Sequence, residues 1–555
     1  MQKKKTIYQV FTRLFCNPSS TCMPNGSIEK NGCGKMNSCT QEILDEIRRN
    51  GYTGIWFTGL IAHASQTDYS SHAIALSNPA TVKGAAGSPY AIRDYYDIDP
   101  DLAVSIKDRM QEFNALVERV HTAGLHFIMD FVPNHVARQY HSANLPDGIH
   151  DLGENDDESC EFSPSNNFYY FPGQVLSGEI DWQDYRECPA RATGNDRFNA
   201  YPGKCDWYET VKLNYGIDWH DGSRHFDPIP DTWIKMTDIL LFWAAKGVDA
   251  FRCDMAEMVP VEFWHYAIRK VRSKFRKVEF IAEIYNPGSY SSYIEYGGFD
   301  WLYDKVGLYD TLRAIVEGRE SATAITRCWQ ATGDNGSHML HFMENHDEQR
   351  ISSDYFAKDP QKAKPAMAIS ALMDACPVMV YAGQEMGERG MDEEGFSGLD
   401  GRTTIFDYWS PSTLRRLYNN GHFNEELLTD GEKSLRSWYS QLMNIARKEK
   451  CVSNGKFFDL MYVNPTSAAF NPHVQYAFLR SDGKNTMLVT ANFSDHDLPT
   501  SVMIPRHAFD YLGMNPAESC RMTDLMTKRT YTAPLLPDST VRFNVPAYSA
   551  TILKW

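Results

Sequence analysis

Three acidic residues follow short apolar segments that lie far apart in the chain: Asp254, Glu283 and Asp347. If these segments are parallel strands of one sheet, the three carboxylates gather at the edge where the strands end. Carboxylates that are crowded in a partly closed site repel one another, so one of them keeps its proton near neutral pH. A protonated acid beside an ionised carboxylate is the arrangement that cleaves glycosidic bonds.

Other polar residues at the same segment ends help to choose between acid–base chemistry and a metal site. A single acid or histidine in such a place is usually a helix cap, a solvated loop residue or a core residue. Here, however, His135, Arg252 and His346 accompany the three acids. Carboxylates and histidines also bind cations, so a metal site is the alternative. Arg252 lies two residues before Asp254, on the same face of its strand, and is better suited to orient a carboxylate than to share it with a metal.

The segments that must position these residues belong to a repeated unit of helix, glycine and strand. In residues 104–132, apolar residues recur at helical spacing, Gly124 follows as a helix stop, and a short apolar strand comes next. Eight strands are predicted in this way: 7–12, 53–58, 125–132, 248–254, 278–283, 300–303, 338–343 and 378–381. Apolar strands that alternate with helices indicate a parallel sheet covered on both faces. Eight units predict an α/β fold, a closed (β/α)8 TIM barrel with its active site at the carboxyl ends of the strands.

Two regions depart from this rhythm. Residues 136–229, directly after the third strand, are rich in Asn, Asp, Gly, Tyr and Phe, and loops of this length are usually functional or small domains. After residue 451, strands alternate with turns, as in the segment Ser481-Asp482-Gly483-Lys484-Asn485 between two strand-like runs. We therefore predict a barrel from 1–135 and 230–450, an inserted domain at 136–229, and a C-terminal antiparallel β-sandwich at 451–555.

Composition excludes several classes of protein. The chain has 555 residues, 43% of them hydrophobic and 23% charged, which is ordinary globular usage and not that of a disordered chain. Its net charge of −16 argues against binding to a nucleic-acid backbone. No apolar run of about 18 residues predicts a membrane span. The basic N-terminal residues lack a following apolar stretch, so the expectation is a cytoplasmic protein, with export after removal of a signal as the alternative. The sequence is silent on oligomeric state.

Four segments occur in the order in which the α-amylase family of retaining glycoside hydrolases carries its characteristic segments. They are DFVPNH at 130–135, GVDAFRCD at 247–254, FIAE at 280–283 and FMENHD at 342–347. Lys212-Leu213-Asn214 is similar to a motif of the neopullulanase-like branch, and Ser88-Pro89-Tyr90 resembles the loop after the second strand. The resemblance covers most of the chain. It implies that the inserted segment is the family's domain B and that the tail is its domain C.

The resemblance also implies a role for each matching residue. Asp254 is expected to be the nucleophile, Glu283 the general acid and then base, and Asp347 the residue that stabilises the oxocarbenium-like transition state. The sugar contacts carried over from the family are stacking by Tyr90, hydrogen bonds from His135 and His346, and orientation of the nucleophile by Arg252.

Two positions raise separate questions. Many α-amylases carry a Lys or Arg and then a His three and four residues after the nucleophile, where this chain has Glu257 and Met258. Glu257 is expected either to contact the leaving sugar or to be a solvated loop residue. Asn134 matches a calcium ligand of many relatives and implies a structural Ca²⁺. Its acidic partners would come from the inserted segment, with Asp151, Glu154, Asp156 and Asp157 as candidates. No organic cofactor is expected.

The expected activity is hydrolysis of α-1,4-glucosidic bonds in starch, maltodextrin or cyclodextrin, with retention at the anomeric carbon. A transglycosylase is the nearest alternative, because it forms the same covalent intermediate. A non-catalytic carbohydrate-binding protein on the same fold is the alternative from another class. Such a protein would be expected to lack at least one of the three acids, and this chain has all three.

Overall fold

Eight parallel strands form the centre of the protein in the computed structural model, which describes residues 4–555. They are β1 (Thr6–Phe11), β2 (Gly54–Thr58), β5 (His126–Phe131), β10 (Ala250–Cys253), β11 (Glu279–Ala282), β12 (Trp301–Tyr303), β13 (Met339–Leu340) and β14 (Val378–Tyr381). Around the sheet they follow chain order, and β14 pairs in parallel with β1. A parallel bridge between His341 and Val378 closes the ring. The predicted (β/α)8 barrel is therefore confirmed.

The strands are buried on both faces, which explains their nearly continuous apolar sequences. Residues that point into the barrel form one cluster: Ile7, Trp56, Ile128, Ala250, Ile281, Tyr303, Tyr309, Leu340, Phe342 and Met379. The alternate residues of the same strands, such as Ile55 and Phe57, belong to the larger core that also includes buried helix residues. The period of two along each strand thus separates an inner core from an outer one.

Helices surround the sheet, and several are connected to the next strand by a glycine as predicted. The main ones are α2 (Gln41–Arg49), α3 (Arg109–Thr122), α4 (Asp231–Ala245), α5 (Val261–Lys274), α6 (Asp310–Val316), α7 (Ala324–Thr332), α8 (Lys364–Leu372) and α10 (Asp430–Lys448). After α3 and α4, Gly124 and Gly247 adopt φ angles of 73° and 97°, a conformation that disfavours side chains. Both helices therefore stop where the sequence indicates.

The seventh strand is shorter than predicted. β13 ends at Leu340, and the polar residues up to Asp347 form a loop. Asn345 Oδ1 accepts hydrogen bonds from the backbone N–H groups of Asp347 and Glu348, both at 2.9 Å, and Glu344 Oε1 accepts one from Ile351 N at 2.6 Å. These side chains replace strand pairing with local turns, because they satisfy the backbone donors themselves.

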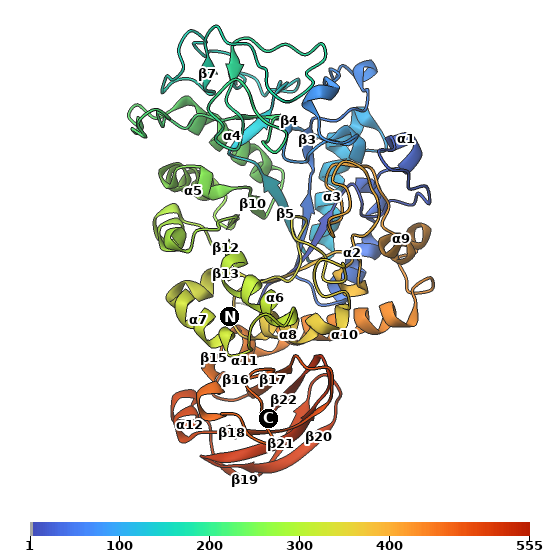
Figure 1. Cartoon of the computed structure of the whole chain (residues 1–555), viewed down its shortest axis with the longest axis vertical. Coiled ribbons are helices and arrows are strands. Elements are labelled where there is room, and N and C mark those ends of the chain that lie inside the picture. The colour runs from blue at the N-terminus through green and yellow to red at the C-terminus, as the bar shows by residue number, and fades with distance from the viewer. Residues whose placement is uncertain (1–3) are drawn as a thin grey trace.

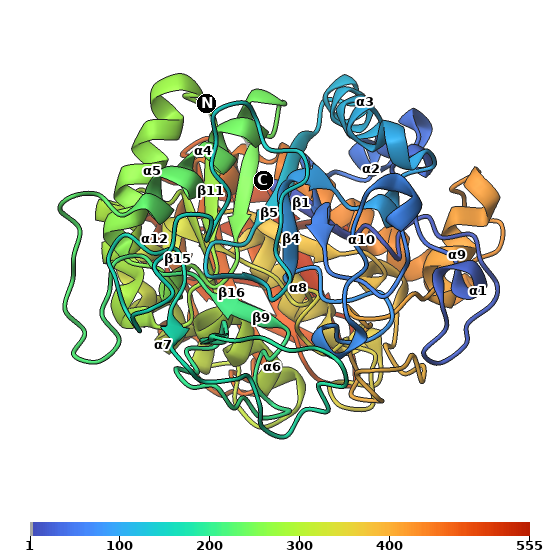
Figure 2. The ribbon, with the colours of Figure 1, turned by 90° about the horizontal axis from the view of Figure 1, so that it is seen from above.

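The segment between β6 (His135–Ala137) and α4 contains few regular elements. Its short strands are β7 (Tyr170–Phe171), β8 (Ala190–Arg191) and β9 (Thr210–Lys212), and β9 pairs antiparallel with β6. Tyr169, Phe171 and Trp182 belong to a separate core within this segment. In Figure 1 the segment lies at the end of the molecule opposite the C-terminal strands, and Figure 2 shows its loops in front of the barrel.

The C-terminal region is an antiparallel sandwich, as predicted. One sheet has the order β15 (Lys456–Asp459), β16 (Gln475–Ser481), β17 (Thr486–Asn492), β22 (Ser549–Lys554), β19 (Ala517–Asp524), β20 (Thr530–Leu535), and the other pairs β18 (Leu498–Ile504) with β21 (Ser539–Val545). Arg480 Nη1 donates a hydrogen bond to Met373 O at 3.0 Å and connects the sandwich to the residue that follows α8. Within residues 4–555, no helix is both long and apolar enough to cross a membrane.

Candidate active site

Strand register brings two of the expected catalytic acids side by side. Cys253 at the end of β10 is paired with Ala282 at the end of β11. The next residues along these strands are Asp254 and Glu283, and neighbouring strands lie only about 4.8 Å apart. Both residues are almost fully buried, with 5% and 3% exposure.

Arg252 connects the acids of three neighbouring strands. Its Nη1 lies 2.9 Å from Asp254 Oδ1 and 3.2 Å from Asp130 Oδ1, and its Nη2 lies 2.7 Å from Glu283 Oε2. The guanidinium is fully buried and lies about 5.4–5.5 Å from the ring centres of Trp56, Tyr90 and Tyr303. A planar guanidinium with several fixed donors can hold more than one carboxylate in a defined orientation.

Two further groups hold Glu283. The backbone N–H of Met255 donates to Glu283 Oε2 at 2.8 Å, and the Tyr285 hydroxyl donates to Glu283 Oε1 at 2.5 Å. Both carboxyl oxygens of Glu283 are therefore fixed in space. Tyr285 was not selected from the sequence, because a tyrosine two residues after an acid carries no signal by itself.

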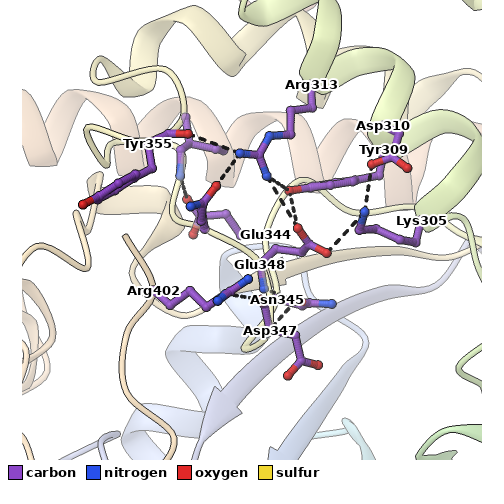
Figure 3. Close-up of polar contacts among 12 residues, drawn as sticks. Lys305, Tyr309, Asp310, Arg313, Glu344, Asn345, Asp347, Glu348, Tyr355 and Arg402 are labelled. Carbon is purple, nitrogen blue, oxygen red and sulfur yellow. Dashed lines mark hydrogen bonds and ion pairs between the residues drawn. The ribbon is translucent and has the colours of Figure 1, made fainter. Parts of the chain in front are cut away.

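Asp347 approaches the same site from the loop after β13 and is the most exposed of the three acids, with 36% of its side chain accessible. Arg402 Nε donates to its carbonyl oxygen at 2.6 Å, and the neighbouring Glu348 accepts a hydrogen bond from the Tyr309 hydroxyl at 3.0 Å. Figure 3 shows that the Asp347 carboxylate points away from this supporting network. The loop is therefore anchored from one side and presents the acid on the other.

His346 lies behind the residues that face the cavity. Its Nδ1 is 2.8 Å from Gln9 Nε2, and its Nε2 is 3.0 Å from Asp347 Oδ2 and also contacts the Tyr90 hydroxyl. Its ring is stacked against Tyr90, with ring centres 5.4 Å apart. Tyr90 lines the cavity, whereas His346 supports Tyr90 and Asp347 from behind.

Burial and mutual repulsion shift the protonation of the acids. Burial raises the pKa of Asp254 well above its usual range, and the charges of Glu283 and Asp347 add to this effect, although Arg252 opposes it. Burial also raises the pKa of Asp347, but His346 and Arg252 lower it by more, to about 2. The substrate-free site therefore favours the protonated form of Asp254. Arg252 thus opposes the rise in the pKa of Asp254, but its charge is shared with Asp130 and Glu283.

The three acids border one cavity of about 330 Å³. Its wall also includes residues that the sequence did not assign to the site, among them Lys83, Trp207, Glu209 and Tyr285. Lys83 Nζ lies 2.9 Å from Glu209 Oε2, and both side chains are largely buried. These residues come from irregular loops and from the inserted segment, where no periodic pattern indicates which side chains face the barrel.

The structure places Glu257 outside the wall of this cavity. Its Oε2 accepts a hydrogen bond from Asn286 N at 3.1 Å, which joins the loops that follow β10 and β11. Contact with a leaving sugar stays a prediction.

The surroundings of Asn134 do not fit the calcium site that the sequence implied. Asn134 Oδ1 accepts a hydrogen bond from the Lys212 ammonium, which also lies 2.7 Å from Asp196 Oδ1. The four acidic candidates instead accept backbone N–H groups of the inserted segment: Asp151 from Ser142 and Leu152, Glu154 from Asp151, Asp156 from Asn167 and Phe168, and Asp157 from Ser159. A lysine ammonium beside Asn134 would repel a divalent cation.

His135 is a buried, neutral residue of the cavity wall. Burial lowers its pKa to about 3, and the charges of Lys212 and Lys83 act in the same direction. Asn134 Nδ2 lies 3.1 Å from His135 Nδ1. A donating Asn134 amide places the ring proton of His135 on Nε2.

Comparison with known proteins agrees with this geometry. Residues 9–215 match the family model described as the catalytic domain of α-amylase. Over residues 9–215, the chain is therefore similar to the α-amylase family. α-Amylase MalA of Haloarcula japonica is 25% identical over 359 residues, which cover 63% of this chain and 41% of that protein. A cyclomaltodextrin glucanotransferase of a Bacillus species (strain 1011) is 22% identical over 423 residues, which cover 72% and 52% of the two chains. The chain thus spans about half or less of these relatives.

The fold of this chain also matches solved structures. The maltogenic α-amylase AmyB of Thermotoga neapolitana superimposes with a TM-score of 0.64 at 20% identity, over 99% of this chain and 98% of the other. This likeness of fold extends over nearly the whole chain, including the inserted segment and the C-terminal sandwich.

We predict that Tyr285→Phe lowers kcat on an α-glucan by about 10- to 100-fold and leaves KM nearly unchanged. The variant loses the hydrogen bond that fixes Glu283 Oε1, and a hydrogen bond to a carboxylate contributes about 1.5–3 kcal/mol whenever that group is ionised. Steady-state kinetics measures the effect. The control is Tyr290→Phe, which removes a buried hydroxyl that has no hydrogen-bond partner among residues 4–555. Equal losses in the two variants would mean that the contact with Glu283 has no special role.

Proposed function

We propose that this protein is a retaining glycoside hydrolase that cleaves α-1,4-glucosidic bonds. The observation that carries the proposal is the pair formed by Asp254 and Glu283 on adjacent strand ends, bridged by one guanidinium at the wall of a cavity. Retaining enzymes have their two carboxyl groups about 5–5.5 Å apart, whereas inverting enzymes leave room for a water between them. One guanidinium that contacts both acids is consistent with the shorter separation.

In the first half-reaction, an Asp254 oxygen attacks C1 of the sugar and the bond from C1 to the bridging oxygen breaks. Glu283 gives its proton to that oxygen, so the leaving sugar departs as a neutral alcohol. This requires the proton of the acid pair to be on Glu283 once substrate is bound. Desolvated carboxylates that share one proton can change its position when a hydrogen-bonding oxygen enters the site.

In the second half-reaction, the ionised Glu283 removes a proton from water, and the water oxygen attacks C1. The ester bond to Asp254 breaks and its carboxylate is restored. Asp347, which remains ionised because its pKa is low, faces the positive charge that develops on the sugar ring in both steps. Two inversions at C1 give overall retention.

The proposed substrate is an α-glucan such as starch, maltodextrin or cyclodextrin. The match to the α-amylase family model supports this class of substrate, and the similarity to an α-amylase and to a cyclomaltodextrin glucanotransferase agrees with it. In the cavity, Tyr90 and Trp207 offer aromatic faces for sugar rings. The charged side chains of Lys83 and Glu209 can form hydrogen bonds with sugar hydroxyls.

The test is the analysis of products from soluble starch, pullulan and a cyclodextrin. We expect shorter α-glucans whose new reducing ends are first released in the α configuration, as measured by NMR within the first minutes. Initial release of the β anomer would exclude retention. Products longer than the substrate at high oligosaccharide concentration would identify a transglycosylase. Binding of an oligosaccharide without any turnover would favour a non-catalytic protein.

A further inference from the structure

We propose that the Lys212 ammonium takes the place of a structural metal ion between the barrel and the inserted segment, and that it positions His135 through Asn134. Its Nζ contacts three oxygens: Asn134 Oδ1, Asp196 Oδ1 at 2.7 Å and Met258 O at 3.2 Å. An ammonium group has three N–H donors and no acceptor, so this set satisfies it completely. Lys212 is itself buried, with 6% exposure.

The three oxygens belong to three different parts of the fold. Asn134 lies between β5 and β6, and Met258 ends the short helical turn Ala256–Met258, four residues after Asp254. Asp196 lies in a tight turn of the inserted segment, in which Thr193 and Arg197 form a bridge. Lys212, the last residue of β9, therefore joins the loop of the expected nucleophile to the inserted segment.

The same oxygen types would suit a hard cation. An amide oxygen, a carboxylate and a backbone carbonyl are ligands that Ca²⁺ takes in proteins. Here the ammonium stands among them, and a second cation would have to displace it or lie beside its charge. In the part of the chain that the structure describes, residues 4–555, no group of three or more His, Cys, Asp or Glu side chains is arranged to hold a metal ion.

The contact also fixes the orientation of an amide. Because Asn134 Oδ1 faces Lys212, its Nδ2 faces Gly194 O at 2.7 Å and His135 Nδ1 at 3.1 Å. Gly194 packs closely on the side chain of His135, since a Cβ at position 194 would lie 2.8 Å from His135 Cβ. Lys212 is thus a positioning residue, which acts on His135 through Asn134 and does not itself line the cavity.

The test compares Lys212→Met and Lys212→Asp with the wild type, each after dialysis against EDTA and after addition of millimolar CaCl₂. We expect the unfolding temperature of the wild type to be the same in both conditions. Lys212→Met should unfold at a lower temperature, lose about tenfold or more in kcat/KM, and gain nothing from Ca²⁺. Lys212→Asp should be destabilised in EDTA and saturably stabilised by Ca²⁺, because a carboxylate then completes the oxygen set.

Lys235→Met is the matched control. Lys235 is another buried lysine of the inserted segment's border, and its Nζ contacts Asp151 O at 2.8 Å and Asn167 Oδ1 at 2.9 Å. We expect this variant to lose stability while kcat/KM stays near the wild-type value. Equal kinetic losses in Lys235→Met and Lys212→Met would overturn the positioning role.

Two results would overturn the proposal that Lys212 takes the place of a metal ion. One is a wild-type unfolding temperature that falls in EDTA and recovers with Ca²⁺, with this recovery lost in Asn134→Leu. The other is a folded Lys212→Asp variant whose unfolding temperature does not respond to Ca²⁺. The measurement of kcat/KM rests on the proposed function, whereas the unfolding temperatures do not. Failure of the proposed function can therefore be distinguished from failure of the proposal about Lys212.

Discussion

Replacement of Asp254 by Asn should abolish α-glucan cleavage, with a loss of at least about 10⁴-fold in kcat, because the amide is too weak a nucleophile to form the glycosyl ester. The change keeps the shape of the side chain, and its amide oxygen can still accept from Arg252. Folding should therefore be retained. Reducing-sugar release from soluble starch, together with the far-UV spectrum and unfolding temperature, measures both properties.

The matched control for this variant is Asp130→Asn. Asp130 contacts the same guanidinium at 3.2 Å and also accepts a hydrogen bond from Trp56 Nε1 at 3.0 Å, but it does not border the cavity. We expect a much smaller loss of activity from this change. Mass spectrometry after reaction with a fluorinated glucosyl fluoride should find the covalent adduct on the peptide that contains Asp254. An adduct elsewhere, or near-wild-type turnover by Asp254→Asn, would reject the assignment.

Replacement of Glu283 by Gln should give the second large effect, a loss of about 10²–10⁴-fold on starch, since the leaving oxygen no longer receives a proton. The loss in the first half-reaction should be small for an α-glucosyl fluoride, whose leaving group needs no acid. Added azide should accelerate turnover of this substrate by attacking the glycosyl ester without a general base. Stopped-flow and steady-state assays with both substrates separate the two half-reactions.

The pH dependence gives a further criterion for Glu283. Burial and the charges of Glu283 and Asp347 raise the pKa of Asp254, so the substrate-free site favours a proton there, and this proton is lost as the pH rises. The wild type should therefore lose activity on the alkaline side, and Glu283→Gln should lack this limb because an amide cannot release a proton there. Glu279→Gln, at the opposite end of the same strand, should keep it. An alkaline limb that persists in Glu283→Gln would mean that another group carries the proton.

The eight-stranded barrel could be predicted because its signals are local. A helix with apolar residues at helical spacing, a glycine and an apolar strand follow one another within about 30 residues, and each copy is readable without the others. The boundaries were less accurate where side chains bind nearby backbone groups. Residues 104–108 precede α3 instead of starting it, because the Glu112 carboxylate accepts hydrogen bonds from Val104 N and Ser105 N.

The inserted segment shows the limit of such signals. Without a period along the chain, nothing indicates which of its side chains face the cavity, and Trp207 and Glu209 could be placed there only by the fold. Four of its acids suggested metal ligands, yet all four accept hydrogen bonds from backbone N–H groups of the same segment. Acidic residues in a loop can either bind a metal ion or accept hydrogen bonds from the backbone. The number of acids in a segment therefore does not show which of these two roles they have.

The chain alone determined which acids stand at the strand ends, because the alternation of helix and strand and the order of the segments are properties of neighbouring residues. Only the tertiary structure decided how those acids share a proton and an arginine, and which cation faces Asn134. Lys212 and Asn134 are 78 positions apart, and Arg252 and Asp130 are 122 apart. Contacts at such separations depend on how the whole barrel closes and where the inserted segment packs, and no local pattern of residues encodes them.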